Sequence, residues 1–344
     1  MTAPDKTPSL TSQTTVAQEA APHFVGIDVA KDSFVACVLP ARQSRTFSQT
    51  REGFDEAIAW LKTFTPRRVV LEATGGYERD LLLALLEAGL PTASINPRQS
   101  HHARQTLLQL DKTDHADAEV LAWMAEHLQL RLQESPPEKL LQLQDLVARR
   151  SQLVRMKTAE MNRKQMARLN SEKNSIERHL KFLVREVKSL EGAIAKLIEA
   201  DDDWTHTARL LQSMPGVGPA TSHALLAELP ELGQANREQI SALAGLAPRA
   251  VQSGPYDGPR HIRGGRANVR AALYMATLAA LRCNPVIKHY YIHLKQLGKQ
   301  AKVAITACMH KLLMILNSML KAGQPWRNVL AMDADPLPGT TEKG

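Results

Sequence analysis

Residues 23–40, HFVGIDVAKDSFVACVLP, decide the fold of the first part of the chain. Apolar and polar positions alternate there around β-branched residues, and Lys31 and Asp32 interrupt the pattern. Alternation with a period of two predicts strands, and the interruption predicts a turn. The stretch is therefore expected to form a β-hairpin.

The segments that follow alternate between strand-like and helix-like patterns. Strands are expected at 45–50, 67–73 and 91–97, and helices at 54–64, 78–89, 100–110 and 116–130. This order predicts a mixed α/β sheet in a domain over residues 23–135, which Pro136 and Pro137 close.

Composition limits the class of protein. With 344 residues, 44% of them hydrophobic and 23% charged, the chain can bury two or three modest cores. No apolar run approaches the roughly 18 residues of a membrane helix, so no membrane association is expected. Residues 1–22 lack the features of a signal peptide and are expected to be a disordered tail. The scattered Cys37, Cys283 and Cys308 indicate neither a disulfide framework nor a zinc site, which fits a reducing cytoplasm.

Charge is distributed unevenly along the chain. Residues 24–133 hold 12 Lys and Arg against 14 Asp and Glu, residues 139–200 hold 14 against 7, and residues 245–311 hold 11 against 1, which is Asp257. Like charges at this density repel unless a polyanion neutralises them. Nucleic acid is the predicted partner, and the alternative is a merely basic surface.

Apolar residues recur at heptad spacing after the two prolines. Over residues 138–200 this pattern predicts two long coiled-coil helices that pack on each other or on a second subunit; the alternative is a helical hairpin with no partner. The apolar positions are Leu140, Leu143, Val147, Val154, Met161, Ile176, Leu180, Leu183, Val187, Leu190, Ile194 and Leu197. A third domain is expected over 205–325, followed by a loose tail over 326–344.

Residues 210–229, LLQSMPGVGPATSHALLAEL, place a Pro-Gly-x-Gly turn between two helical patterns. This is typical of a helix-hairpin-helix, in which Gly216 and Gly218 would let backbone N–H groups approach a DNA phosphate. The alternative is a simple turn between two helices. The rest, from 241 to about 322, is expected to be mostly helical around one Gly/Arg-rich loop.

Four carboxylates of the first domain are expected to converge. Asp28 lies on the first strand, Glu72 ends a buried strand, and Asp114 and Asp117 are three residues apart at the start of a helix. Grouped carboxylates suit Mg²⁺, and such a site is common in phosphodiester chemistry. Asp111, three residues before Asp114, leaves the register open at this stage.

Each carboxylate also has a simpler alternative. Asp28 could be a turn residue at the end of a strand, and Glu72 could pair with Arg67 or Arg68. Asp114 or Asp117 could cap a helix.

Several segments resemble one known family when they are taken together. They are GIDVAKD, LEATGGYE, SINPRQ, DKTDHADAEVLA, SMPGVGPATSHALLAEL, ALAGLAPRAVQSG and RGGRANVRAALYMA. In this order they resemble the DEDD-type transposases of the insertion-sequence-110 family, the bridge-RNA-guided recombinases. The resemblance runs from about residue 24 to about residue 325.

The resemblance implies an N-terminal RNase H-like domain of the RuvC type, a coiled-coil dimerisation region and a mostly helical C-terminal transposase domain. It assigns the DEDD carboxylates, as Mg²⁺ ligands, to Asp28, Glu72, Asp114 and Asp117 rather than to Asp111. It also assigns the nucleophile to Ser253. The residues alone indicate only a loop serine before Gly254 and Pro255.

The resemblance implies DNA cutting and rejoining through a covalent Ser253–DNA intermediate. The implied partners are donor and target DNA, a bridge RNA, and further copies of the chain, as a dimer and as a tetramer in the synaptic complex, in the bacterial cytoplasm at the nucleoid. The implied phosphate contacts are Arg249, Arg260, Arg263, Arg266 and Arg270. The N-terminal extension and the loop PYDGPRHIRGG depart from the family pattern.

Three other functions compete with this interpretation. An actin-like sugar kinase would have a similar first strand pair, but it needs further Gly-rich nucleotide loops that the sequence lacks. A Mg²⁺-dependent Holliday-junction endonuclease would use the acidic residues alone and leave free DNA ends. A non-catalytic DNA-binding protein is disfavoured, because a cleft of carboxylates repels phosphate unless metal is present.

Overall fold

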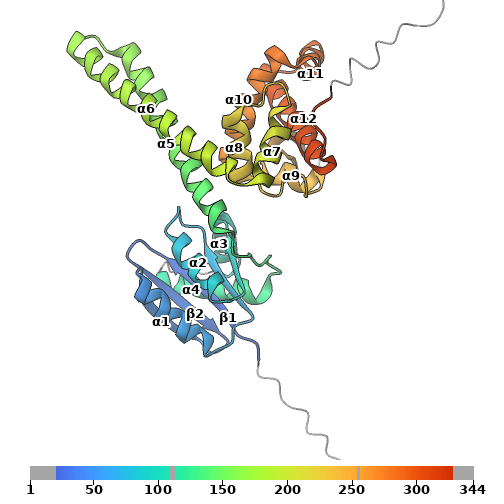
Figure 1. Ribbon diagram of the computed structural model, residues 1–344. Coiled ribbons are helices and arrows are strands. Elements are labelled where there is room, and N and C mark those ends of the chain that lie inside the picture. The colour runs from blue at the N-terminus through green and yellow to red at the C-terminus, as the bar shows by residue number, and fades with distance from the viewer. Residues whose placement is uncertain (1–20, 109–112, 254–255, 328–344) are drawn as a thin grey trace, which may run out of the picture. The chain divides into compact units, whose positions relative to one another are not determined.

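The computed structural model describes residues 21–108, 113–253 and 256–327, with the backbone alone for residues 250–253 and 256–259. The predicted tails 1–22 and 326–344 lie almost entirely outside these residues, as do Asp111, Gly254 and Pro255. The chain divides into two compact units, residues 1–136 and residues 137–344 (Figure 1). Each unit is described by itself.

Unit 1 is built on a five-stranded sheet of order β3-β2-β1-β4-β5. The strands are β1 (Phe24–Val29), β2 (Ser33–Leu39), β3 (Gln43–Ser48), β4 (Arg68–Glu72) and β5 (Thr92–Ile95). The first three strands pair antiparallel, whereas β1, β4 and β5 run parallel. The predicted hairpin and mixed sheet are confirmed.

Helices cover both faces of this sheet. They are α1 (Arg51–Lys62), α2 (Glu78–Glu87), α3 (Pro97–Thr106) and α4 (Asp114–His127). One core joins α1 and α2 to the first face through Val25, Ile27 and Phe54, among others. Helix α4 packs on the opposite face of β1, β2 and β4. Helix α1 begins three residues before its predicted start, because the Thr50 side chain caps it by accepting a hydrogen bond from Gly53 N.

Gly26 sets the distance between α4 and β1. A Cβ atom at this position would lie 2.1 Å from Ala118 O and 2.1 Å from Ala122 N, both on the backbone of α4. No side chain fits in that space, so the helix lies directly on the strand. Because alternate residues of a strand point to the same face, Asp28 faces α4 as Gly26 does.

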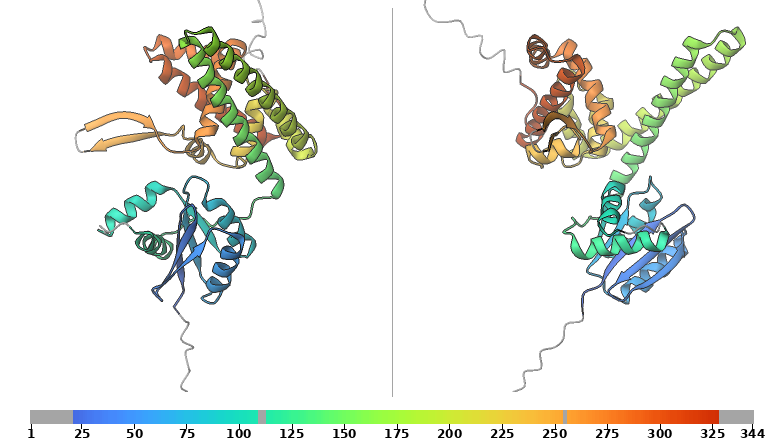
Figure 2. Two further views of the ribbon diagram at one scale, coloured as in Figure 1. Left: turned by 90° about the vertical axis from the view of Figure 1, so that its left-hand side faces the viewer. Right: turned by 180° about the vertical axis from the view of Figure 1, so that it is seen from behind.

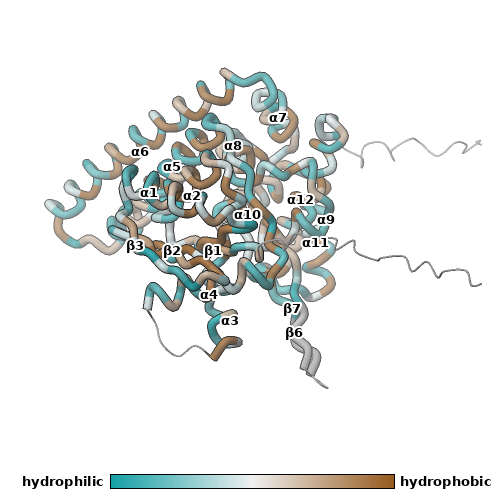
Figure 3. Tube along the Cα trace, turned by 90° about the horizontal axis from the view of Figure 1, so that it is seen from below, coloured by the Kyte–Doolittle hydropathy of each residue, from teal (hydrophilic) through white to brown (hydrophobic). Residues whose placement is uncertain are grey.

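Unit 2 begins with two long helices, α5 (Glu138–Met166) and α6 (Asn170–Glu199), which pack on each other. The two predicted helices are present, and hydrophobic and hydrophilic residues alternate along α6 (Figure 3). Leu143, Val147, Leu183 and Ile194 are buried as the heptad pattern predicts. Met161 is 50% exposed, so the predicted apolar seam is not closed along its whole length.

The remaining helices of unit 2 enclose the largest core of the described residues. They are α7 (Asp202–Gln212), α8 (Pro219–Glu228), α9 (Arg237–Leu243), α10 (Ala267–Cys283), α11 (Pro285–Gln296) and α12 (Ala301–Ala322). By length and composition α12 could cross a membrane, although Lys302, Lys311 and Lys321 interrupt its apolar run. Its Cys308, Leu312 and Leu316 lie in this core, as in the core helix of a soluble protein.

A two-stranded antiparallel hairpin, β6 (Pro248–Ser253) and β7 (Tyr256–Ile262), interrupts these helices. It extends away from the helices of unit 2 (Figure 2). The predicted Gly/Arg-rich loop is confirmed at residues 263–266, RGGR. The residues before it form β7 instead, and Ser253 ends a strand rather than lying in a loop. Pro248 begins β6, and Gly258 and Pro259 lie within β7, so the alternating pattern on which a strand prediction depends is hidden.

Candidate active site and nucleic-acid contacts

Asp28 is the fifth residue of β1 and pairs with Val35 of β2, so the alternative of a turn residue at the strand end is wrong. Its side chain is half-buried. The pKa of Asp28 is raised from its ordinary 3.8 to about 6. Burial is the largest cause, and the negative charges of Asp114 and Glu72 add to it, whereas the nearby Arg104 acts in the opposite direction. Asp114 and Glu72 are therefore each close enough to Asp28 to oppose its ionisation.

Asp114 and Asp117 lie in the first turn of α4. The residue that caps this helix is Thr113, whose hydroxyl oxygen accepts a hydrogen bond from Ala116 N, so the capping alternative for the two aspartates is wrong. The Asp117 carboxylate forms an ion pair with the Arg104 guanidinium of α3. The ion pair is made at Oδ1 of Asp117, which is buried.

Glu72 ends β4 and pairs with Ile95 of β5. Its Oε2 accepts a hydrogen bond from the Ser100 hydroxyl of α3. The predicted alternative, a pair with Arg67 or Arg68, is not formed; Nη1 of Arg68 donates to the backbone oxygens of Ala125 and Leu128 instead.

The four carboxylates fit a divalent cation in chemistry and charge. Hard oxygen donors suit Mg²⁺, and a cation would relieve the repulsion that Asp114 and Glu72 exert on Asp28. Within the described residues, however, no three such groups are arranged to hold a metal ion together. Arg104 and Ser100 occupy two of the four carboxylates, so binding requires these contacts to rearrange.

Arg104 and Ser100 were not singled out from the sequence. Both lie on α3 and act on carboxylates that belong to a different helix and to a strand. No local spacing connects them to Asp117 or Glu72. Only the tertiary packing of α3 reveals the contacts.

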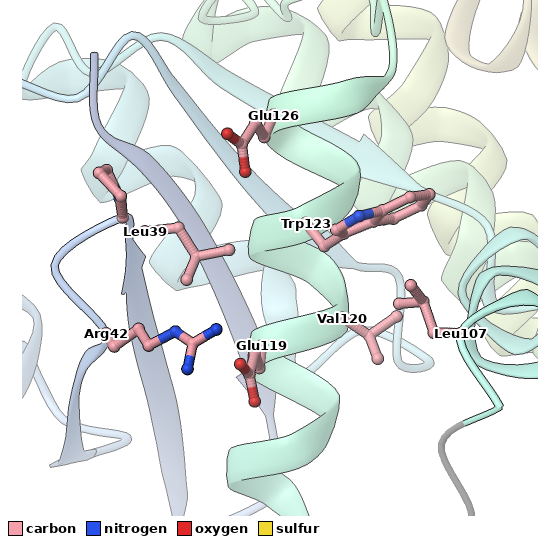
Figure 4. A pocket seen from close by; sticks show the side chains of 8 residues that line it. Leu39, Arg42, Leu107, Glu119, Val120, Trp123 and Glu126 are labelled. Atoms are coloured by element: carbon pink, nitrogen blue, oxygen red, sulfur yellow. The ribbon is translucent and has the colours of Figure 1, made fainter. Parts of the chain in front are cut away.

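A separate pocket of about 380 Å³ in unit 1 lies beside α4 (Figure 4). Glu119, Glu126 and Arg42 are its charged lining residues, and Trp123 forms part of its apolar wall. None of the four predicted carboxylates lines it.

Ser253 is the last residue of β6, and its backbone pairs with that of Tyr256 across the hairpin. Arg249 pairs with His261 on the same hairpin. Arg249, Arg260 and Arg263 are exposed, and none forms an ion pair with a described carboxylate. Exposed cations on and next to the hairpin that carries Ser253 are compatible with the predicted phosphate contacts.

Arg266 and Arg270 are engaged inside the protein. The Arg266 guanidinium donates two hydrogen bonds to the Glu231 carboxylate, of 2.6 and 2.7 Å, and a third of 3.0 Å to Glu228 O. Nη1 of Arg270 donates to Gly264 O at 2.5 Å. These contacts give both residues a structural role that competes with the predicted phosphate contact.

The two glycines of the predicted helix-hairpin-helix differ in their surroundings. Gly216 has φ of +101°, and a Cβ there would lie 2.6 Å from the backbone of Ala280 on α10, so close packing requires glycine. Gly218 is exposed, with no atom within 4 Å of an added Cβ. Of the two, Gly218 is the one that a ligand can approach freely.

Two family models match the chain, and together they cover both units. A model of the DEDD transposases of IS110 type matches residues 25–191, and the model described as transposase IS116/IS110/IS902 family matches residues 208–292. The chain belongs to the IS110 family of transposases. This transposase is therefore an enzyme of DNA transposition or recombination.

Relatives of the transposase include proteins with two kinds of name. The pilin gene-inverting protein of Moraxella bovis is 27% identical over 88% of this chain and 97% of its own length. The transposase for insertion sequence element IS1111A of Coxiella burnetii is 27% identical over 67% of this chain and 70% of its own length. Among solved structures, the RuvC structure of Thermus thermophilus aligns with 32% of this chain and 99% of its own, at 16% identity and a TM-score of 0.25.

Proposed function

We propose that this transposase cuts and rejoins DNA through a covalent bond between Ser253 and a DNA phosphate, assisted by the carboxylates around Asp28. The observation that carries the proposal is the position of Asp28 within reach of the charges of Glu72 and Asp114, in a protein of a transposase family. Carboxylates that repel one another are costly unless they serve a cation-dependent reaction.

The reaction conserves the energy of the phosphodiester bond. The Ser253 oxygen attacks the phosphorus and loses its proton, the bond to the 3′-oxygen breaks, and that oxygen takes up a proton to leave a 3′-hydroxyl. Attack of a new 3′-hydroxyl on the phosphoserine reverses both steps and joins the new strand. The cycle therefore needs neither ATP nor water as a reactant.

Asp28, Glu72, Asp114 and Asp117 are the residues that would hold Mg²⁺. When bound, the cation supplies positive charge against the scissile phosphate. Arg104 holds Asp117 in place in the metal-free protein. Ser253 and the carboxylates belong to different units of the chain, so assembly with a second copy would control when they meet.

The proposed partners are donor and target DNA, a bridge RNA and further copies of the chain. The exposed apolar side chains of α5 and α6 and of the turn between them support self-association: Met156, Met161, Met166, Leu169, Phe182 and Val184. The mixed sheet, with a carboxylate on its first strand, supports an RNase H-like fold for unit 1. The proposed helix-hairpin-helix is α7, the Gly216–Gly218 turn and α8.

A Ser253→Ala variant tests the nucleophile. With labelled DNA carrying the element ends, the wild-type protein is expected to give a protein–DNA adduct that survives denaturing electrophoresis, and the variant none. The variant should bind the same DNA with unchanged affinity, because the hydroxyl is not a phosphate anchor. An adduct that persists in the variant would show that another residue is the nucleophile.

The same assay separates recombination from the alternative of a Mg²⁺-dependent junction endonuclease. Hydrolysis leaves free ends and no adduct, with or without Ser253. Sequencing of RNA that co-purifies from cells carrying the flanking non-coding DNA tests the guide. A discrete RNA from that flank is expected, and its absence would remove the bridge RNA from the proposal.

A further inference from the structure

A cavity of about 500 Å³ lies in unit 2 between α9, α11 and α12. Its charged lining residues are Arg237, Lys311 and Lys321, and no carboxylate lines it. The rest of the wall comes from Tyr290, Ala307, His310, Met314, Asn317 and Ser318. None of the residues assigned to the proposed reaction is among them.

The three cations lack partners of opposite charge. None of them forms an ion pair with a carboxylate in the part of the chain that the structure describes. Lys311 Nζ lies 4.3 Å from the ring centroid of Tyr290, a cation–π contact that leaves its positive charge unneutralised. Cations gathered around one cavity raise its positive potential and attract an anion.

The sequence explains why no carboxylate neutralises the positive charge of this cavity. Between Asp257 and Asp333 the chain contains no Asp or Glu, so α10, α11 and α12 have none to offer. Helix α9 contains Glu238 next to Arg237, but Glu238 does not line the cavity. The wall is acid-free over its whole extent.

Hydrogen bonds hold the wall in place before any ligand binds. Asn317 Oδ1 accepts from Gly233 N at 2.8 Å, and its Nδ2 donates to Ala235 O at 3.0 Å. The Ser241 hydroxyl donates to Arg237 O at 2.6 Å and lies 3.0 Å from His310 Nε2. Because its only proton is used on Arg237 O, Ser241 accepts from His310 and is not an activated nucleophile. Arg237 is thus tied to α12.

Burial and the nearby charge of Arg237 lower the pKa of His310, so its ring is neutral near pH 7. The positive charge of the cavity therefore comes from Arg237, Lys311 and Lys321. Arg can bind two phosphate oxygens side by side, while Lys acts as a compact point charge. The three together match a chain of phosphates better than a neutral ligand.

We infer that this cavity binds the phosphodiester backbone of a nucleic acid, separately from the cleavage site. DNA and RNA backbones share this chemistry. The inference rests on the proposed function in one respect, that the ligand of the transposase is nucleic acid. It adds a contact on the face formed by α9, α11 and α12, which the sequence motifs do not indicate.

The test is the salt dependence of binding to a fluorescent DNA duplex of arbitrary sequence and to an RNA hairpin. The cavity variant carries Arg237→Gln, Lys311→Gln and Lys321→Gln. The matched control removes the same charge from the acid-free segment outside the cavity: Lys288→Gln, Lys299→Gln and Lys302→Gln. All three control residues are exposed.

Each phosphate contact to duplex DNA contributes about 0.9 to the slope of log affinity against log salt. The cavity variant is expected to lose about 2 to 3 from that slope for at least one of the two probes, and the control variant less than about 1. A loss with DNA alone, or with RNA alone, identifies the ligand. Equal slopes for the two triple variants, or a wild-type slope in the cavity variant, would overturn the inference.

A second variant guards against a folding defect. Lys311→Arg combined with Lys321→Arg keeps the charge and should retain the wild-type slope, and melting curves should match for all proteins. The adduct assay with Ser253 is read separately at saturating DNA. If the wild-type protein forms no adduct, the serine mechanism is rejected. If the cavity variant still loses the expected 2 to 3 from its salt slope, the assignment of the cavity is retained.

Discussion

At the scale of single residues, Asp28 and Arg104 show how the acidic site is balanced without metal. Asp28 lies among negative charges that oppose its ionisation, and Arg104 offsets part of that repulsion while it holds Asp117. Burial of Asp28, together with two opposing sets of charges on neighbouring elements, thus determines its protonation.

An Asp28→Asn variant should stabilise the metal-free protein near neutral pH. The folded-state pKa of about 6 lies above the ordinary 3.8, so ionisation of Asp28 costs stability as pH rises through 6, and the cost is absent below 3.8. The expected gain at about pH 7 is roughly 1–2 kcal/mol, shrinking towards zero at about pH 4.

Urea denaturation with chelator present measures this difference. Asp32→Asn, at an exposed position in the turn after β1, serves as the control. A gain that is constant across the pH range would contradict the raised pKa.

An Arg104→Gln variant should bind divalent metal more tightly. Removal of the guanidinium frees Asp117 and leaves the carboxylates with a larger net negative charge, so affinity for Mn²⁺ is expected to rise about tenfold, or about 1.4 kcal/mol. The metal-free variant should melt at a lower temperature than the wild-type protein, since the repulsion is no longer offset.

Calorimetric titration with Mn²⁺ and melting curves in chelator measure the two effects. Arg98→Gln, an exposed arginine on the same helix, is the matched control. Unchanged metal affinity would mean that Arg104 does not compete with the cation.

At the scale of elements, different residues of α5 and α6 serve folding stability and self-association. Leu183 is buried against Leu153 and Val187, whereas Met161 is half exposed in the same pair of helices. Buried apolar groups hold the two helices together, and the exposed ones are available to a second copy.

Leu183→Ala is expected to cost about 2–3 kcal/mol of unfolding free energy, because it leaves a cavity in the contact between the helices. Met161→Ala should change that free energy by less than about 0.5 kcal/mol and weaken self-association. Urea denaturation and sedimentation velocity measure the two quantities. Loss of association with Leu183→Ala alone, at a temperature where it stays folded, would place the interface elsewhere.

The same scale shows what sequence patterns could predict. Strand alternation and helix periodicity gave the sheet of unit 1, the two long helices and the placement of Asp28 on β1, because these signals are local. The β6–β7 hairpin was missed because Pro and Gly interrupt its alternation, which also misplaced Ser253 in a loop. The partners of Asp117 and Glu72, and the cationic cavity, depend on contacts between separate elements that no spacing records.

At the scale of the whole molecule, charge and hydrophobic core are divided between two units. Every core cluster lies within one unit. Residues 24–133 are slightly acidic, whereas residues 245–311 carry 11 cations against one acid. Each unit is therefore expected to fold without the other, and unit 2 is expected to bind nucleic acid without unit 1.

Expression of residues 21–136 and of residues 137–327 as separate chains tests this division. Both should unfold cooperatively, and the second alone should bind duplex DNA with a steep salt dependence, since it carries most of the cations. Fluorescence anisotropy at increasing salt gives the comparison. Tight DNA binding by the first fragment in the absence of divalent metal would contradict the proposal that the cations of unit 2 bind the DNA.

The contact of Gly26 with α4 has a consequence for how mutations in this protein should be interpreted. Any larger residue at position 26 would act as a wedge under the helix that carries Asp114 and Asp117, and would move both away from Asp28 on the strand. In a scan of substitutions scored by activity, Gly26 would therefore rank with the carboxylates, although it has no side chain that can touch DNA or metal. Loss of activity on substitution of Gly26 would reflect the distance between β1 and α4 and not a chemical role of this residue.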